Sequence, residues 1–161
     1  MLEHLFVRLE HNWLIVFLNG SVLTSSILEV THYFSIFMAV GATVIVDLRL
    51  LGLAAQRQPA TQIKEQLFPW VWTGFFLALI SGFLMFAADA PEYLHNSVFH
   101  HKVEVVLLAA LLAAIIQRNV PRWDHGPSLP PAAKIWAAVS LVVWVWTILL
   151  GVNVPALTGV G

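Results

Sequence analysis

Cysteine is absent from this chain of 161 residues, and charged side chains make up only 11% of it. The lack of cysteine excludes disulfides, thiolate metal sites, iron–sulfur clusters and the covalent attachment of c-type haem. Soluble domains carry about 25% charged residues on average, so the shortfall indicates a protein that lies in lipid. The formal net charge of −1 argues against nucleic acid as a partner.

Residues 1–20 lack the features of a cleaved signal, because acidic residues interrupt the basic segment and no small-residue cleavage site follows. Apolar residues recur there at helical spacing, while most charged and histidine side chains lie elsewhere on the helical wheel. This pattern predicts an amphipathic helix in the membrane interface. The alternative is an additional, poor spanning segment.

Four apolar runs fill most of the remaining chain, and each approaches or reaches the ~20 residues that a spanning helix needs. They cover residues 27–46, 68–88, 99–116 and 133–152. Pro69 is expected at the start of the second helix and Pro91 shortly after its end. We therefore predict an all-α integral membrane protein, with a four-helix up-down bundle over residues 21–161.

Six of the eight lysine and arginine residues lie in the loops that follow the first and third apolar runs. The positive-inside rule places these loops in the cytoplasm. Both termini and the loop between the second and third helices then face outward, which in a bacterium is the periplasm. The sequence thus predicts a multi-pass protein of the bacterial inner membrane, with the lipid bilayer around it.

Glu29 and His32 lie one helical turn apart in the first apolar run. Because ionisable groups are costly in hydrocarbon, such a pair is a functional-site hypothesis. Thr43 and Asp47 continue the same stripe, which we expect to face the bundle interior. A second polar cluster begins the third helix at a similar depth, and it consists of His100, His101, Lys102 and Glu104.

Two neutral imidazoles on facing helices suit haem iron, copper or zinc. His32 is one candidate ligand, and His100 or His101 is the other, with His32 and His101 as the expected metal pair. Neighbours on a helix point about 100° apart, so at most one of the adjacent histidines faces squarely inward. Glu29 or Glu104 would orient a ligand imidazole as a hydrogen-bond acceptor, beside Lys102.

A purely structural interpretation explains the same residues. Glu29 would pair with Lys102, and His32 would bond Ser140 or a backbone carbonyl, as polar groups often do between membrane helices. The remaining histidines are expected to be solvated surface residues, and they are His4, His11, His95 and His125.

Small and aromatic residues mark the packing faces of the other helices. Gly74, Ala78 and Gly82 are spaced by four, which favours close helix packing and could also admit the edge of a macrocycle. Trp144 lies well inside the fourth run, where it would stack on a cofactor or quinone or fill the core. At the end of the first run, Asp47 and Arg49 are interpreted as a structural anchor.

Several motifs in residues 25–151 resemble those of a family of bacterial four-helix inner-membrane proteins that is classed as a domain of unknown function. The most specific is the run Asp47-Leu48-Arg49-Leu50-Leu51-Gly52, which follows Glu29-x-x-His32. The others are Pro69-Trp70, Ser81-Gly82-x-x-x-Phe86-Ala87-Ala88, Phe99-x-x-Lys102 and Ser140-x-x-x-Trp144. The resemblance implies a four-helix membrane bundle, loosely similar to the copper-resistance D and cytochrome b561-like bundles.

The leading functional hypothesis is a small b-type cytochrome, or the membrane subunit of a redox complex, with haem b near the outer face. Electrons would pass between quinone and a periplasmic redox partner. Such a protein is an electron-transfer or anchor subunit rather than a stand-alone enzyme. The alternatives are an anchor or assembly subunit without a cofactor, which binds partner membrane subunits, and a conduit for metal ions or protons. Copper is the alternative to haem as the bound cofactor.

Overall fold

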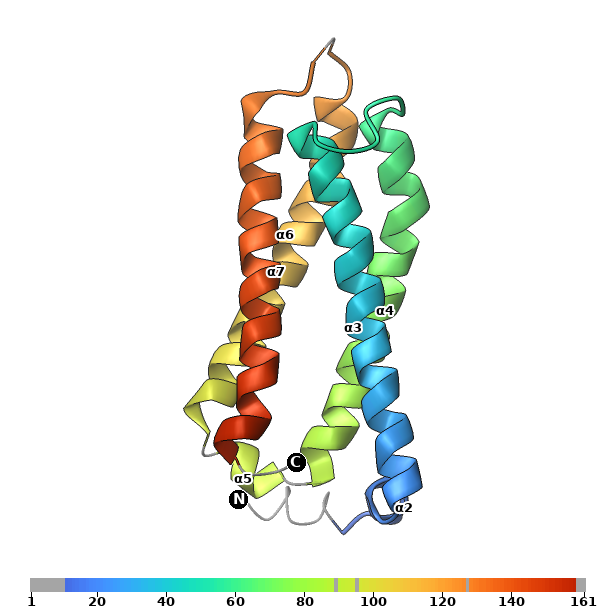
Figure 1. Ribbon diagram of the computed structural model, residues 1–161, viewed down its shortest axis with the longest axis vertical. Helices are drawn as coiled ribbons and strands as arrows, with labels where there is room; N and C mark the ends of the chain where they lie inside the picture. The colour runs from blue at the N-terminus through green and yellow to red at the C-terminus, as the bar shows by residue number, and fades with distance from the viewer. Residues whose placement is uncertain (1–10, 89, 95, 127, 159–161) are drawn as a thin grey trace.

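The computed structural model describes residues 11–88, 90–94, 96–126 and 128–158, and within these ranges it contains helices and no strands. Four long helices form an up-down bundle (Figure 1). They are α3 (Val22–Leu51), α4 (Ala60–Ala88), α6 (Ser97–Trp123) and α7 (Pro131–Thr158). Each of these helices has a segment long and apolar enough to cross a membrane. The predicted fold is confirmed, and the chain is a multi-pass membrane protein.

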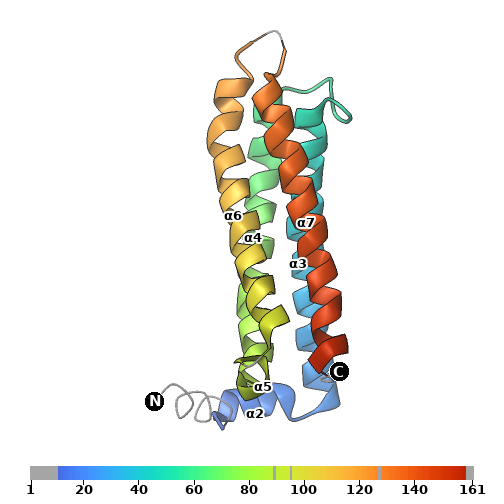
Figure 2. The same cartoon turned by 90° about the vertical axis from the view of Figure 1, so that its left-hand side faces the viewer.

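Two short helices lie at one end of the bundle. Helix α2 (Trp13–Asn19) runs across that end, as Figure 2 shows, and precedes α3. Helix α5 (Ala90–Leu94) lies in the connection between α4 and α6 and was not predicted from the sequence. The expected interfacial helix over residues 1–20 falls partly outside the described residues. The two loops rich in lysine and arginine lie at the opposite end (Figure 1).

The helices extend beyond the apolar runs, and this corrects the expected position of Pro69. Helix α4 begins at Ala60, so Pro69 lies inside the helix rather than at its start. Pro121 likewise lies inside α6, which ends only at Trp123. A proline removes one backbone hydrogen bond, but membrane helices tolerate the loss where neighbouring groups satisfy the freed carbonyl. The extra turns are polar and continue the helices past the apolar layer.

Local capping explains several helix ends. The Ser21 side chain accepts a hydrogen bond from the N–H of Thr24 at 3.2 Å and starts α3. Asn96 caps α6 in the same way. Gly52 ends α3 in the left-handed conformation, with φ of 78°. The N–H of the next residue, Leu53, then bonds a carbonyl of the last turn, as in a Schellman motif.

Helices α3 and α4 touch backbone to backbone at Gly74. A Cβ atom at Gly74 would lie 2.6 Å from the carbonyl oxygen of Ser35 and 2.7 Å from the amide nitrogen of Ala39. No larger residue fits there without moving one helix. The close packing predicted from the spacing of small residues on α4 is therefore confirmed at this position.

The main buried cluster lies in the half of the bundle nearest the two basic loops. It draws small and branched residues from all four long helices: Ala42, Val46, Leu50, Ala60, Ile63, Phe68, Val71, Ala113, Ile116, Val120, Ala133 and Ala137. A smaller cluster of Val40, Ala109 and Trp144 adjoins it. Large exposed apolar side chains, such as Phe37 and Val142, cover the outer surface. That surface faces the acyl chains of the bilayer.

One carboxylate joins two helix ends that are distant in the sequence. Asp124 is the C-terminal cap of α6, and its Oδ2 accepts a hydrogen bond from the N–H of Thr61 at 2.9 Å. It thereby caps the first turn of α4 from outside that helix. Although partial burial acts in the opposite direction, hydrogen bonds from Thr61 and Ala60 and the charge of Arg49 lower the pKa of Asp124 below its ordinary 3.8.

We expect Asp124→Ala to destabilise the bundle by about 1 kcal/mol, because the first turn of α4 loses its external cap. Because the pKa of Asp124 is lower in the folded than in the unfolded protein, its charge stabilises the fold fully above the unfolded-state pKa. This stabilisation is lost as the pH falls through the folded-state pKa. Thermal unfolding in detergent between pH 3 and pH 7 measures both effects. Asp124→Asn keeps an acceptor and should remove only the pH dependence, and equal pH profiles for the wild type and this variant would contradict the assignment.

Candidate functional site

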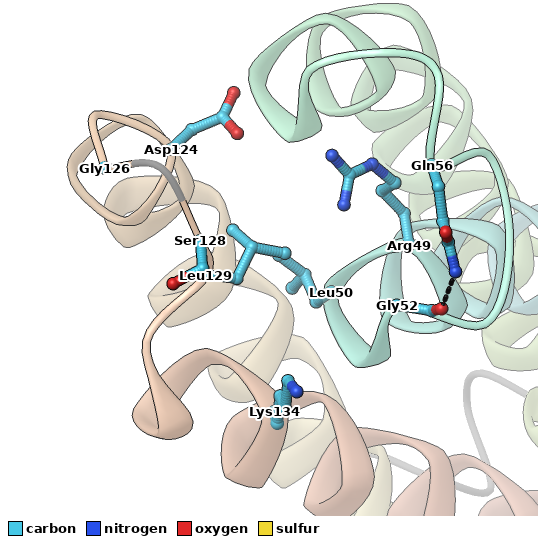
Figure 3. Close-up of a pocket in the computed structure, with 9 residues that line it drawn as sticks. All are labelled: Arg49, Leu50, Gly52, Gln56, Asp124, Gly126, Ser128, Leu129 and Lys134. Carbon is cyan, nitrogen blue, oxygen red and sulfur yellow. Dashed lines mark hydrogen bonds between the residues drawn. The ribbon is translucent and has the colours of Figure 1, made fainter.

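A pocket of about 340 Å³ lies at the end of the bundle that carries the basic loops (Figure 3). The end of α3, the loop after it, the loop before α7 and the first turn of α7 line the pocket. Its polar side chains include Arg49, Asp124 and Lys134. The Nε atom of Arg49 donates to the carbonyl of Gln58 at 2.8 Å, so Arg49 fastens the α3–α4 loop rather than the carbonyls of its own helix end.

His32 lies in the opposite half of the bundle, between α3 and α4. The His32 Nδ1 atom is 3.0 Å from the hydroxyl oxygen of Ser81. That hydroxyl is 2.7 Å from the carbonyl oxygen of Leu77 and 3.3 Å from that of Ala78. The Ala78 carbonyl is itself within hydrogen-bonding reach of the imidazole. Ser81 and Ala78 of α4 therefore both contact the ring.

These contacts allow the tautomer of His32 to be assigned. Because the Ser81 hydroxyl lies only 2.7 Å from the carbonyl oxygen of Leu77, we assign its single hydrogen to that bond. The Ser81 oxygen is then the acceptor toward His32, and Nδ1 carries the ring proton. The lone pair of the neutral imidazole remains on Nε2. A histidine held through Nδ1–H with a free Nε2 lone pair is the usual arrangement of a metal-ligating imidazole.

Gly82 and Lys102 complete the surroundings of the ring. A Cβ atom at Gly82 would lie 2.9 Å from the Cε1 atom of His32, so the absence of a side chain there makes room for the imidazole. Lys102 of α6 is close enough for its charge to act on His32. Among the described residues no carboxylate forms an ion pair with Lys102. The site is thus one oriented imidazole with one half-buried ammonium group across from it.

Glu29 departs from the predicted interior stripe. The stripe faces inward at Val40, Thr43 and Asp47, whereas Glu29 is exposed. Leu28 takes the inward position at this level of α3 instead. Glu29 interacts with the hydroxyl of Tyr33, one turn further along the same helix. Among the described residues, Glu29 therefore forms no ion pair or hydrogen bond with His32 or Lys102.

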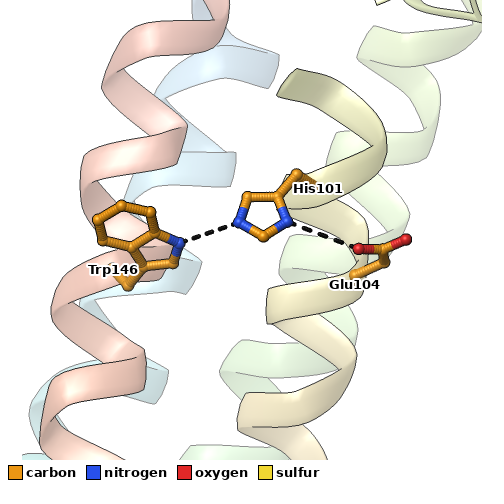
Figure 4. Close-up of polar contacts among 3 residues, drawn as sticks. All are labelled: His101, Glu104 and Trp146. Carbon is orange, nitrogen blue, oxygen red and sulfur yellow. Dashed lines mark hydrogen bonds and ion pairs between the residues drawn. The ribbon is translucent and has the colours of Figure 1, made fainter. Parts of the chain in front are cut away.

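The adjacent histidines of α6 point away from His32. His100 is exposed and packs edge-on against Phe99. His101, whose side chain is 49% exposed, accepts a hydrogen bond at Nε2 from the Nε1 atom of Trp146 at 3.2 Å (Figure 4). The His101 Nδ1 atom lies 3.5 Å from the carboxylate of Glu104. Lys102, and not either histidine, is the residue of this cluster that faces His32.

Aromatic side chains pack near the start of α6, in the same half of the bundle as Lys102. The rings of Phe86 and Phe99 stack with their centroids 5.2 Å apart, and Tyr93 packs against both. Trp144 lies deeper, in the small cluster with Val40, which is two helical turns beyond His32 on α3. Trp144 is thus a core residue at the middle of the bundle.

The structure also places the remaining histidines. His11 is exposed, and His125 is exposed with its Nδ1 atom close to the carbonyl of Pro121. His4 and His95 lie outside the described residues. No group of three or more His, Cys, Asp or Glu side chains in the described parts of the chain is arranged to hold a metal ion.

Sequence reasoning missed Ser81 as the partner of His32. The available signal was the dipeptide Ser81-Gly82, which pairs a hydroxyl with a missing side chain on a membrane helix. Such a pair can accept a ring that approaches from a neighbouring helix. The choice between Ser81 and the predicted Ser140 depends on helix rotation, which the apolar pattern of α4 leaves open because most of its faces are apolar.

Comparison with known proteins identifies a family but no function. No curated protein and no solved structure matches the chain. Residues 12–154 match the sequence model of DUF6644, which is described as a family of unknown function. The match covers all four spanning helices almost completely. The chain therefore belongs to the family of unknown function DUF6644.

Proposed function

We propose that the protein is a small b-type haem-binding membrane protein, or the membrane subunit of a redox complex. Haem would lie in the half of the bundle that holds His32, and electrons would pass near the face where α2 lies. This face would be the periplasmic side of the inner membrane, because the basic loops lie at the other end. Quinone and a periplasmic redox protein are the partners that such a role requires.

The orientation of His32 carries the proposal. Its Nδ1–H is held by Ser81, which leaves Nε2 to ligate iron. Haem brings four nitrogen ligands of its own, so the chain needs to supply only axial ligands. A bare copper or zinc ion needs more protein ligands, and no such cluster occurs in the described residues. The proposal therefore favours haem over a mononuclear metal site.

Lys102 and the nearby aromatic residues support the same choice. A half-buried ammonium group that has no carboxylate partner among the described residues suits the propionate of a haem. The stacked rings of Phe86 and Phe99 offer an apolar surface near the start of α6. The main buried cluster lies in the other half of the bundle, so a haem beside His32 would not displace it.

His101 is the candidate second axial ligand, and its use requires a local rearrangement. Its Nε2 atom accepts a hydrogen bond from Trp146, so binding to iron through that atom would replace this contact. If His101 does not bind, His32 would be the single axial ligand, and the other axial position of the iron would be open. The two arrangements differ in their absorption spectra, which makes them separable by experiment.

We expect the detergent-purified protein, expressed with added haem, to show a Soret band and a change on reduction with dithionite. His32→Ala should abolish the haem signal, and Ser81→Ala should weaken haem binding roughly 10-fold, because the ring loses its orienting partner. His101→Ala should convert a six-coordinate spectrum into a five-coordinate one if His101 is the second ligand.

Two variants serve as matched controls for the haem experiment. His100→Ala removes an exposed imidazole and should leave the spectrum unchanged. Gly82→Ala pushes against the His32 ring and should perturb the signal, whereas Gly41→Ala, with no atom within 4 Å of the added Cβ, should not. A haem-free protein after supplementation, or a spectrum indifferent to His32→Ala, would refute the proposal.

A specific observation favours a second candidate, an anchor or assembly subunit. His101 and Glu104 form a pair on the outer face of α6, with side chains 49% and 75% exposed. Glu104 is seven residues into α6, about 10 Å along the helix axis. An exposed ionisable pair is costly against acyl chains, so a partner membrane helix that covers it would be stabilising.

Site-specific photo-crosslinking in native membranes tests this second candidate. A photoreactive residue at position 104 should give one defined crosslinked product, because a partner helix covers that face. The same residue at position 37, where Phe37 is 71% exposed on α3, is the control and should react with lipid only. Equal yields at both positions would show that no partner prefers the α6 face.

A further inference from the structure

Four buried polar atoms lack any hydrogen-bond partner within the described residues. They are both carboxyl oxygens of Asp47, the hydroxyl oxygen of Ser140 and the Nε1 atom of Trp144. The side chain of Asp47 belongs to α3, and the other two belong to α7. An unpartnered polar group in a low-dielectric interior is costly, so four at one interface require an explanation.

The other buried hydroxyl groups show that this exception is local. Ser35, Thr43, Ser81 and Thr147 each donate to the backbone carbonyl one turn back in their own helix. Ser140 is as deeply buried as they are but makes no such bond. Its hydroxyl interacts instead with the carboxyl group of Asp47, without reaching normal hydrogen-bond geometry.

Donors and acceptors at this interface are complementary but form no hydrogen bond of normal geometry among the described residues. Asp47 offers acceptor oxygens, Trp144 offers only a donor, and Ser140 offers both. Ser140 and Trp144 are one helical turn apart and lie on the same face of α7. We name the interface between Asp47 of α3 and Ser140 and Trp144 of α7 the polar seam.

No described cation neutralises Asp47. The guanidinium of Arg49, two residues on, turns to the α3–α4 loop. Lys134 of α7 lines the pocket at the bundle end, and no charged side chain of α4 or α6 forms an ion pair with Asp47 among the described residues. Leu50, one turn beyond Asp47 and fully buried, lines the same pocket. Leu50 is thus the pocket-lining residue nearest to Asp47 along α3 on its C-terminal side after Arg49.

We propose that the polar seam is an internal proton-binding site, in which Asp47 takes up and releases one proton. Bound water links the carboxyl group to Ser140 and Trp144. On uptake, a hydronium ion that enters from the pocket transfers one proton to a carboxylate oxygen and leaves as water. Release is the reverse step. This proposal stands independently of haem, since none of its groups contacts His32 among the described residues.

Infrared difference spectroscopy of the purified protein in lipid nanodiscs, between alkaline and acidic buffer, tests the proposal. A protonated carboxyl band of an apolar environment should appear in acid and shift in D₂O. Asp47→Asn should remove this band, whereas Glu65→Gln, which alters an exposed carboxylate of α4, should leave it. Ser140→Ala and Trp144→Phe keep Asp47 and should move the band, because each alters its hydrogen bonding.

Two outcomes would overturn the proposal. The first is a set of carboxyl bands that is the same in the wild type and Asp47→Asn, or a wild-type protein with no such band. The second is a higher Tm in Na⁺ than in choline that is lost in Asp47→Asn. That result would show that the polar seam binds a metal cation. If the pocket is the entry route, Leu50→Val should accelerate the exchange of the band in D₂O relative to the wild type, and unchanged or slower exchange would exclude that route.

Discussion

The lack of hydrogen-bond partners in lipid governs the architecture of this bundle. Each polar group inside the apolar layer has to find its partner within the protein, because acyl chains offer none. Most hydroxyl groups of the spanning helices meet this requirement locally, by donating to their own backbone. His32 meets it across the α3–α4 interface through Ser81. Asp47, Ser140 and Trp144 do not meet it with described protein atoms, which sets them apart from the rest of the interior.

The sequence predicted the four spanning helices because length and hydropathy alone decide which segments cross a bilayer. It did not predict where the helices end. Helix α4 starts at Ala60 partly because Asp124, far along the chain, accepts from the backbone of Thr61. No local pattern contains such a partner, so Pro69 was placed at a helix start instead of inside the helix. Gly52, in contrast, is a local signal, and its left-handed conformation accounts for the end of α3.

The sequence predicted how deep the candidate site lies in the bundle, but not how its helices are rotated about their own axes. Helical rise placed His32 at the level of the polar cluster on α6, and the influence of Lys102 on His32 agrees with that level. Which residue of that cluster faces inward depends on how α6 turns about its axis. Apolar residues occur on several of its faces, so the sequence did not decide which of His100 and His101 faces inward, and it assigned Lys102 only a supporting role. Glu29 was placed inside because it shares a stripe with His32, but Leu28 fills that direction.

The backbone contact at Gly74 has a consequence for how the bundle can move. Because no side chain separates α3 from α4 there, a displacement of one helix toward the other would bring their backbones into collision, so we expect the two helices to move as one unit. Packed helices slide by small shear displacements where side chains, rather than backbones, form the interface. Between α3 and α7, side chains such as those of Val40 and Trp144 form the contact. A tilt of α3 and α4 together would therefore change the spacing between Asp47 and Ser140, whereas the contacts of His32 with Ser81 and Gly82, which join these two helices, would stay the same.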